Sequence, residues 1–311
     1  MIENFHIRPL ETADTEAIVA LYNKASARDP NIGPITTAQW VDFVQRPHNR
    51  GGCDFRVALR GGQLVGLAES SLRDQGDQFV RFFKLVVEPP VRRQGLGTLL
   101  LEQVLALDAP APNLNFQTLA SGDWLDGIAF LEARGFTHIE SEIGMRCKAL
   151  AELSPALPTG VFVERCPSPV LMAAEVANLL NAAFAADVAF RRYAEAEIAT
   201  ILALEGQELW LVRTDRDILG CCRLELETTF VWLEQIAIRP SDQGRGLGQA
   251  LAYHALKSAD IGSERVAGLN VASVNASAQA VYAKLGFTAQ RETRRYGIRQ
   301  LELMAKLSRR Q

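Results

Sequence analysis

A glycine-rich segment that occurs twice is the feature that most constrains the fold of this chain. Residues 86–97 read VVEPPVRRQGLG and residues 237–248 read AIRPSDQGRGLG, so the two segments align without a gap. The same offset aligns the Gly-Phe pair at residues 135–136 with the Gly-Phe pair at residues 286–287. A repeat of this length is typical of a duplicated domain and not of a solenoid unit. The sequence therefore predicts two similar domains in tandem.

The glycines of the second segment predict an anion site. A strand-like run at residues 232–238 enters this loop, and a helix-like run at residues 249–257 leaves it. Gly244, Gly246 and Gly248 let the backbone turn tightly and approach a ligand without a Cβ in the way. The first turn of the helix adds unpaired N–H donors and the positive end of its dipole. A phosphate group is the expected occupant.

Two other glycine motifs do not fit this loop. A Walker loop ends in Gly-Lys-Ser/Thr, whereas Gly248 is followed here by Gln249 and Ala250. A dinucleotide fingerprint has a third small residue where this chain has Leu251, and it follows the first strand of its domain. A plain glycine turn without a ligand stays open as an alternative.

Length and patterning predict the domain organisation. The chain has 311 residues, 48% of them hydrophobic, which is enough for two domains that each bury a core. Residues 151–160 contain two prolines and a glycine and have the composition of a linker. We expect an N-terminal domain at residues 1–150 and a C-terminal domain at residues 161–311. Hairpins followed by a strand–loop–helix–strand unit predict an α/β (α+β) fold, with a mixed, mostly antiparallel sheet flanked by helices in each domain.

Charge and residue types argue against several classes of protein. The formal net charge of −3 argues against a nucleic-acid partner. The five cysteines form no CxxC motif and the four histidines show no metal-ligand spacing, so we expect reduced cysteines and no metal. Residues 1–11, MIENFHIRPLE, carry charges where a signal peptide needs apolar residues, and no apolar run is long enough to span a membrane. We expect a cytoplasmic protein.

The repeated motif resembles the pyrophosphate loop of the GNAT superfamily of acyl-CoA N-acyltransferases. Its pattern, Gln/Arg-x-x-Gly-x-Gly, stands here as Gln243-x-x-Gly246-x-Gly248 and as Arg92-x-x-Gly95-x-Gly97. Residues 271–287, VASVNASAQAVYAKLGF, are similar to the next strand and helix of that family. The resemblance covers essentially the whole chain twice. It implies acetyl-CoA as a cosubstrate. For the acceptor we expect a primary amine of a small molecule, and for the oligomeric state a monomer or homodimer.

The resemblance also implies which residues bind the cofactor. In the second copy, backbone groups of the strand before the loop pair with the pantetheine arm, and the loop surrounds the pyrophosphate. Asn275 either contacts the cofactor or caps its helix. The implied residues of the second copy are Ile236, Ala237, Ile238, Gln243, Gly244, Arg245, Gly246, Leu247, Gly248, Gln249 and Asn275. Those of the first copy are Val87, Arg92, Arg93, Gly95 and Gly97.

Glu234 is the leading candidate for a general base. An alkylammonium with a pKa of about 10.4 must lose a proton before it attacks a thioester, which costs about 4.6 kcal/mol at pH 7, so a base is useful. Strand alternation places Glu234 on one face with Trp232 and Ile236. A carboxylate among apolar neighbours is costly unless it is used or paired. A surface position or a structural ion pair remains the alternative.

Tyr282 is the candidate general acid. A phenol with a pKa of about 10 is protonated at neutral pH and can donate to a departing thiolate. Tyr282 also lies on a helical stripe with Ala278, Val281 and Leu285, and an aromatic residue on such a stripe usually packs in a core. The spacing alone favours core packing, whereas the family resemblance favours the acid.

The two copies differ at the candidate catalytic positions. The ungapped partners of Glu234 and Tyr282 in the first copy are Phe83 and Leu131, which cannot carry a proton. The partner of Asn275 is Trp124, although a shift of one residue would offer Asp123. The first copy therefore either binds an acyl-CoA or serves as a scaffold, and the second copy is the expected catalyst.

We therefore expect an N-acetyltransferase that moves an acetyl group from acetyl-CoA to a primary amine by direct attack, with an active C-terminal domain. The alternative from a different class of protein is a catalytically silent protein that binds or senses acyl-CoA. An enzyme that acetylates amines of proteins or peptides is a further variant.

Overall fold

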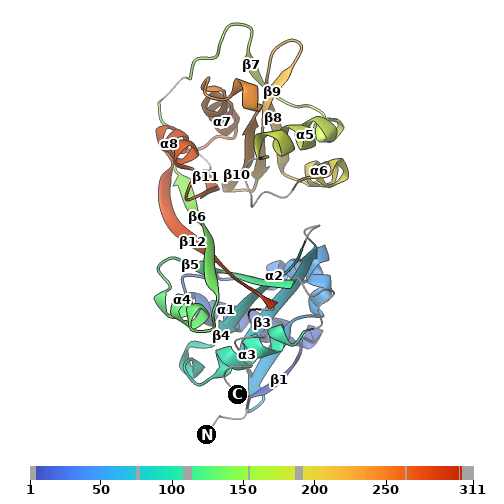
Figure 1. The fold of residues 1–311 in the computed structure, drawn as a ribbon, viewed down its shortest axis with the longest axis vertical. Helices are drawn as coiled ribbons and strands as arrows, with labels where there is room; N and C mark the ends of the chain where they lie inside the picture. The colour runs from blue at the N-terminus through green and yellow to red at the C-terminus, as the bar shows by residue number, and fades with distance from the viewer. Residues whose placement is uncertain are drawn as a thin grey trace. The chain divides into compact units, whose positions relative to one another are not determined.

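The computed structural model describes residues 5–74, 78–107, 114–152, 155–185, 192–262, 265–300 and 302. By its internal contacts the chain divides into two units (Figure 1). Unit 1 consists of Met1–Ser141 and Glu292–Gln311, and unit 2 consists of Glu142–Arg291. Each unit is described by itself below.

Unit 1 holds the first copy of the repeat. Its elements are β1 (His6–Pro9), α1 (Thr15–Ser26), α2 (Thr37–Gln45), β2 (Arg56–Arg60), β3 (Gln63–Asp74), β4 (Phe79–Val87), α3 (Leu96–Leu105), β5 (Leu114–Ser121) and α4 (Leu125–Glu132). Strands β1 to β4 pair antiparallel in sequence order, and β4 then pairs parallel with β5. The hairpin and the strand–loop–helix–strand unit expected from the sequence are both present.

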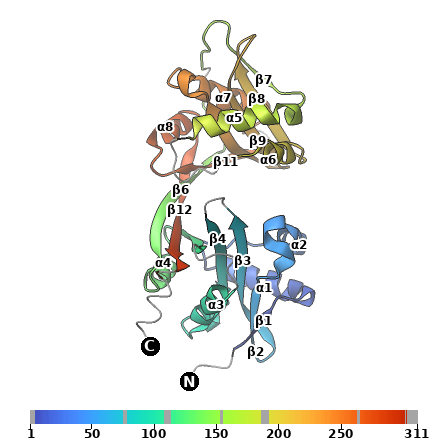
Figure 2. The same cartoon turned by 45° about the vertical axis from the view of Figure 1, so that its right-hand side comes forward.

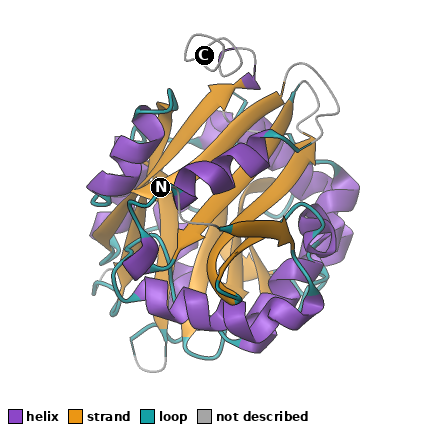
Figure 3. Ribbon diagram, turned by 90° about the horizontal axis from the view of Figure 1, so that it is seen from below, coloured by secondary structure: helices purple, strands orange, loops and turns teal. Residues whose placement is uncertain are grey.

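Unit 2 repeats this arrangement. Its elements are β7 (Phe162–Arg165), α5 (Ala173–Ala183), α6 (Glu195–Leu202), β8 (Gln207–Arg213), β9 (Ile218–Leu226), β10 (Phe230–Ile238), α7 (Leu247–Ser258), β11 (Val266–Ala272) and α8 (Ala276–Lys284). Strands β7 to β10 pair antiparallel, and β10 pairs parallel with β11. Helices flank the strands, as Figure 3 shows by colour. The predicted mixed, mostly antiparallel sheet flanked by helices is therefore confirmed.

Two long strands, β6 (Thr137–Cys147) and β12 (Thr288–Arg299), complete the sheets. In unit 2, residues Glu142 to Cys147 of β6 pair antiparallel with β11. In unit 1, residues Thr293 to Arg299 of β12 pair antiparallel with β5. The strand that follows α4 in the chain thus extends the sheet of unit 2, and the strand that follows α8 extends the sheet of unit 1.

Each sheet is covered by apolar side chains on both faces. In unit 2, α5 and α6 pack on one face against Leu209, Leu211 and Ala237 (Figure 2). Helices α7 and α8 pack on the other face against Leu224 and Leu233. Unit 1 has the same two layers, formed by α1 with α2 and by α3 with α4. Burial on both faces fixes the strand register and hence the position of the loops at the strand ends.

An asparagine fixes the start of the second front helix in both units. Asn23 donates from Nδ2 to the carbonyl of Ile35 over 3.3 Å and accepts at Oδ1 from the N–H of Ile35 over 3.0 Å. Asn181 makes the same two bonds with Tyr193, over 3.0 and 2.9 Å. This pair of hydrogen bonds from one asparagine, called the asparagine clamp below, shows that the copies are equivalent well away from the glycine loop. In unit 2 it places Tyr193 beside the candidate site.

Candidate active site

The glycine loops of the two units adopt the same backbone conformation. Gly246 is the N-cap of α7 with φ 77°, and Gly95 is the N-cap of α3 with φ 88°. Two residues earlier, Gly244 and Arg93 also have positive φ values, 75° and 65°. A Cβ built on Gly246 or Gly95 would meet no heavy atom within 4 Å, so the space in front of each loop is open. An open loop at a helix N-terminus is the geometry that binds phosphate.

The first residue of each motif, Gln in unit 2 and Arg in unit 1, links the loop to the strand before it by a hydrogen bond. Gln243 donates from Nε2 to the carbonyl of Ile238 over 3.1 Å, and Arg92 donates from Nε to the carbonyl of Val87 over 3.0 Å. In unit 2, Asp242 accepts from Arg239 over 2.7 Å and from Arg245 over 2.5 Å. The hydrogen bonds from Arg239 and Ser241 hold the pKa of Asp242 below its usual value. The charged residues of this loop are therefore engaged in bracing it.

The strand that enters each loop has an unpaired edge. Strands β10 and β11 pair at three positions, the first between Phe230 and Val266 and the last between Trp232 and Gly268. Both strands are described over their whole length, and they form no further pairs. Beyond that point, Ile236, Ala237 and Ile238 pair with β9 on one side only. In unit 1, β4 and β5 likewise separate after the pair formed by Phe82 and Gln117. Each unit thus offers free backbone groups along the strand that leads to the phosphate loop, at the place implied for the pantetheine arm.

A β-bulge at Glu234 distinguishes unit 2 from unit 1. The register between β10 and β9 shifts between Leu233 and Gln235, which leaves Glu234 without a partner across the strands. Leu233 and Ala237 consequently pack on opposite faces of the sheet, although strict alternation would place them on the same face. Strand β4 keeps an unbroken register with β3 from Val87 to Phe79. Bulges re-aim side chains next to active sites.

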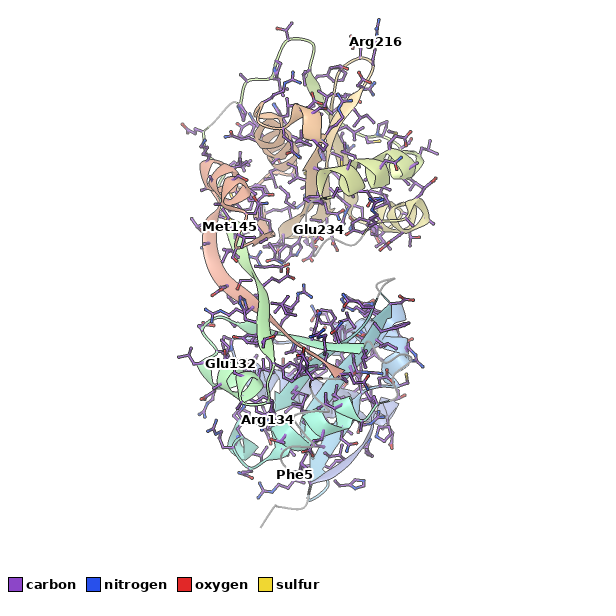
Figure 4. The ribbon with its side chains drawn as sticks, in the orientation of Figure 1. Phe5, Glu132, Arg134, Met145, Arg216 and Glu234 are labelled. Atoms are coloured by element: carbon purple, nitrogen blue, oxygen red, sulfur yellow. The ribbon has the colours of Figure 1, made fainter. Side chains whose placement is uncertain are left out.

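The bulge changes the surroundings expected for Glu234. Alternation predicted that it would share a face with Trp232 and Ile236, among apolar neighbours, and the bulge breaks that pattern. The side chain of Glu234, which is labelled in Figure 4, is 34% exposed. It pairs with Arg223, whose Nη2 lies 3.3 Å from Oε2. Glu234 therefore carries a partner and reaches solvent at the same time.

Arg223 organises a polar network that the sequence patterns did not reveal. From β9 it donates to Gln207 on β8 over 2.6 Å and to Gln235 on β10 over 3.5 Å, besides its contact with Glu234. Gln235 in turn donates from Nε2 to the hydroxyl of Tyr193 over 2.8 Å. Arg223 interrupts an apolar run on β9, which is the one sequence signal for this network. The cluster of Tyr193, Gln207, Arg223 and Gln235 is called the polar network below.

Tyr282 lies in the apolar core of unit 2. It is 7% exposed and belongs to the cluster that contains Cys222 and Leu285, with its ring centroid 6.0 Å from that of Phe287. Burial, and to a smaller extent the neighbouring Cys222 thiol, raises the pKa of Tyr282 above its usual value. The phenol is thus held in its protonated form. No hydrogen bond or ion pair joins Tyr282 to Glu234 within the described chain.

Asn275 caps helix α8. Its Oδ1 accepts from the N–H of Ala278 over 3.0 Å, which is the capping interaction weighed as one of its two roles. Trp124 is the N-cap of α4, and its φ and ψ of −87° and 69° match the −88° and 66° of Asn275. The ungapped alignment of these two positions therefore holds. Asp123, the alternative partner, instead accepts a hydrogen bond from Ser121.

Unit 1 contains a cavity of about 540 Å³ that reaches its glycine loop. The cavity is bordered by Arg92, Arg93, Gly95 and Gly97 of the loop, by the edge of β4, by Thr118 and Leu119 of β5, and by α4. Its volume lies within the range of about 300–1,000 Å³ for small-molecule sites. Leu131, the counterpart of Tyr282, lines it as well. The first copy has thus kept an open groove without the candidate acid.

Other kinds of site find no support in the part of the chain that is described. Its cysteines are free thiols. Among these residues no three His, Cys, Asp or Glu side chains gather closely enough to hold a metal ion. No described helix is long and apolar enough to cross a membrane.

Comparison with known proteins establishes the family. The acetyltransferase (GNAT) family matches this chain twice, over residues 17–136 and 173–287. The chain therefore belongs to the GNAT acetyltransferase family and carries two of its domains in tandem. Members of this family use acetyl-CoA.

Two curated relatives and two solved structures show how far the similarity extends. A mycothiol acetyltransferase of Mycolicibacterium vanbaalenii is 28% identical over 297 residues, covering 89% of this chain and 94% of the relative. One of Mycobacterium marinum is 29% identical over 230 residues, covering 66% and 70%. A GCN5-related N-acetyltransferase from Sphaerobacter thermophilus matches with a TM-score of 0.77, 16% identity and coverage of 95% and 96%. A tandem GNAT protein from the clavulanic acid biosynthesis pathway matches with a TM-score of 0.74, 20% identity and coverage of 96% and 99%.

The open loop of unit 2 leads to a prediction about cofactor binding. Gly246→Val places a branched side chain in the space in front of the loop, so we expect isothermal calorimetry to show the loss of one acetyl-CoA site per chain. Gly160→Val is the matched control, because Gly160 also has a positive φ, 78°, and open surroundings, but lies outside the loop. Both variants carry similar backbone strain. Retention of full binding by a folded Gly246→Val protein would rule out the phosphate site.

Proposed function

We propose that unit 2 transfers an acetyl group from acetyl-CoA to a primary amine of a small molecule by direct attack. The observation that carries this proposal is the β-bulge at Glu234. It places a carboxylate beside the unpaired edge of β10 in unit 2, whereas β4 of unit 1 has neither the bulge nor the carboxylate. The fold and the family support the reaction type for both units, so the bulge is the feature that favours unit 2 over unit 1 as the catalyst.

The cofactor fits the residues that are present. The N–H groups around Gly246 and the start of α7 would hold the pyrophosphate, since the space in front of them is open. The unpaired backbone groups of Ile236 and the N–H of Ile238 would hydrogen-bond the pantetheine arm as an added strand does, while the Ile238 carbonyl accepts from Gln243. Bound in this way, acetyl-CoA supplies the activated acyl group.

Glu234 would remove the proton that the amine must lose. Its carboxylate is exposed enough to meet an acceptor, and Arg223 fixes its position from β9. The polar network extends from Arg223 to the hydroxyl of Tyr193 and can orient the acceptor by hydrogen bonds. Orientation of this kind supplies much of the rate enhancement in such a direct attack.

Tyr282 would return a proton to the leaving thiolate. Its raised pKa keeps the phenol protonated at neutral pH, and the same shift makes it a weaker acid, so the donation depends on a thiolate held close to the hydroxyl. Its burial agrees equally with a packing role, because Tyr282 is also a core residue. A kinetic test must separate the two.

Unit 1 would bind an acyl-CoA without transferring its acyl group to an outside amine. The support is its open loop and its cavity, together with Phe83 and Leu131 at the positions of the base and the acid. The same cavity supports the alternative in which the whole protein senses acyl-CoA and transfers nothing.

The acceptor is proposed only as a class. The curated relatives are named for mycothiol, which favours a small-molecule acceptor related to mycothiol over an amine of a protein or peptide. Release of CoA thiol across a panel of small amines and peptides tests this choice. Tight binding of acetyl-CoA with no thiol release from any amine would favour the sensor.

Glu234→Gln tests the base. Without the carboxylate, the amine must reach its neutral form in solution, so we expect kcat/KM to fall by about 10²- to 10⁴-fold at pH 7. The remaining rate should climb about tenfold per pH unit towards the amine pKa of about 10.4. Glu227→Gln, an exposed carboxylate just beyond the end of β9, is the control and should leave the rate unchanged. Equal rates for both variants at pH 7 would remove Glu234 from the mechanism.

Tyr282→Phe tests the acid. The substitution keeps the ring in the core and removes only the hydroxyl, so we expect kcat to fall by about 10²- to 10⁴-fold while the affinity for acetyl-CoA stays unchanged. Tyr253→Phe, at another largely buried tyrosine of unit 2, controls for the loss of a buried hydroxyl. If Tyr282→Phe turns over like the unchanged enzyme, the residue serves packing alone.

A further inference from the structure

A lysine stands at the end of the cavity in unit 1. Lys84 lines this cavity from β4, directly opposite Glu69 on β3 in the strand register. Its Nζ lies 4.9 Å from the centroid of the Tyr22 ring, and the hydroxyl of Tyr22 donates to the Glu69 carboxyl. Among the described residues, Lys84 makes no hydrogen bond or ion pair of its own. Lys84 thus presents an amine to the cavity, and the hydrogen-bonded pair of Tyr22 and Glu69 lies behind it.

Lys84 would lie at the acyl end of an acyl-CoA bound in this cavity. The pyrophosphate would lie at Gly95, and the pantetheine arm would run along the free edge of β4, away from the loop. That edge begins where β4 and β5 separate, after the pair formed by Phe82 and Gln117. Thr118 closes the opening by donating to the carbonyl of Phe83 over 2.7 Å. The thioester would then lie beside residues 83 and 84, and the cavity offers Lys84 as the nearest amine.

Glu69 is suited to take a proton from this amine. It is 7% exposed, and burial raises its pKa to about 7, against the opposing effect of the Lys84 charge. A carboxyl group with a pKa near neutrality both accepts and releases a proton at working pH. Asp29, which also lines the cavity, is instead paired with Arg92 over 3.3 Å.

We propose that Lys84 is acylated within unit 1 by the acyl-CoA that this cavity binds. This inference rests on the proposed occupancy of unit 1. The Lys84 ammonium gives one proton to the Glu69 carboxylate, and the neutral amine forms a bond to the thioester carbon. The carbon–sulfur bond breaks, the sulfur takes up the second amine proton, and Glu69 releases its proton to water. The products are an amide at Lys84 and free CoA thiol, and no other reactant is required.

The second copy explains why this reaction is confined to unit 1. Gln235 occupies the position of Lys84, and Arg223 occupies the position of Glu69 across the strand pair. An amide side chain cannot attack a thioester, so unit 2 leaves its acyl group for an outside amine. Acylation of Lys84 would remove a positive charge and add bulk at the end of the unit 1 cavity.

Incubation of the full chain with acetyl-CoA, followed by intact-mass measurement and peptide mapping, tests the proposal. We expect one acetyl group per chain, located at Lys84. Lys84→Gln, which introduces the residue of the second copy, should abolish it, and Glu69→Gln should slow it at least tenfold. Gly95→Val should also abolish it, whereas Gly62→Val, with similar φ and open surroundings outside the loop, should not. Lys24→Gln removes an exposed lysine and should change nothing.

Three results would overturn the proposal. If calorimetry finds two acetyl-CoA sites per chain while Lys84 stays unmodified, self-acylation fails and the proposed occupancy stands. If acetyl-CoA binds only through the unit 2 loop, self-acylation and the proposed occupancy of unit 1 both fail. If acetyl groups appear on Lys24 and Lys84 alike and persist in Gly95→Val, the modification is unspecific chemistry of the thioester in solution.

Discussion

The separation of a parallel strand pair is the constraint on which both sites of this protein depend. In each unit the strand before the glycine loop stays paired on one side and loses its partner on the other. Unpaired backbone groups inside a sheet are costly unless something else bonds them. The opening therefore favours a ligand that carries its own hydrogen-bonding groups, and a glycine loop at a helix N-terminus suits an anionic one. A pantetheine arm with a pyrophosphate has both properties.

The two copies keep the same backbone and differ in the side chains placed around the opening. The loop glycines, the asparagine clamps and the N-caps at Trp124 and Asn275 agree closely. The chemistry diverges at the strand pair beside the opening, where unit 1 has Glu69 with Lys84 and unit 2 has Arg223 with Gln235. The bulge at Glu234 adds a carboxylate on one side only. The same scaffold thus carries different polar side chains at equivalent positions of its two copies.

The sequence predicted those features that local patterns encode. The repeat, the loop conformation and the helix caps follow from residue type and spacing, and the fold class follows from the order of the elements. The exchange of β6 and β12 between sheets was not predictable, because an alternating strand does not specify its partner. The bulge escaped prediction because WLEQIAI reads as ordinary alternation until one residue is left out of the register. The polar network depends on the register of β10 with β9, and the placement of Lys84 opposite Glu69 depends on the register of β4 with β3, so both appeared only in the structure.

In the proposed division of labour, unit 2 acetylates an outside amine and unit 1 binds an acyl-CoA of its own. Steady-state turnover of a small amine by Gly95→Val and Gly246→Val, each checked for folding by its thermal melt, tests this most directly. We expect Gly246→Val to lose turnover and Gly95→Val to retain it. Loss of turnover in a folded Gly95→Val protein, with turnover preserved in Gly246→Val, would contradict this division of labour and move catalysis to unit 1.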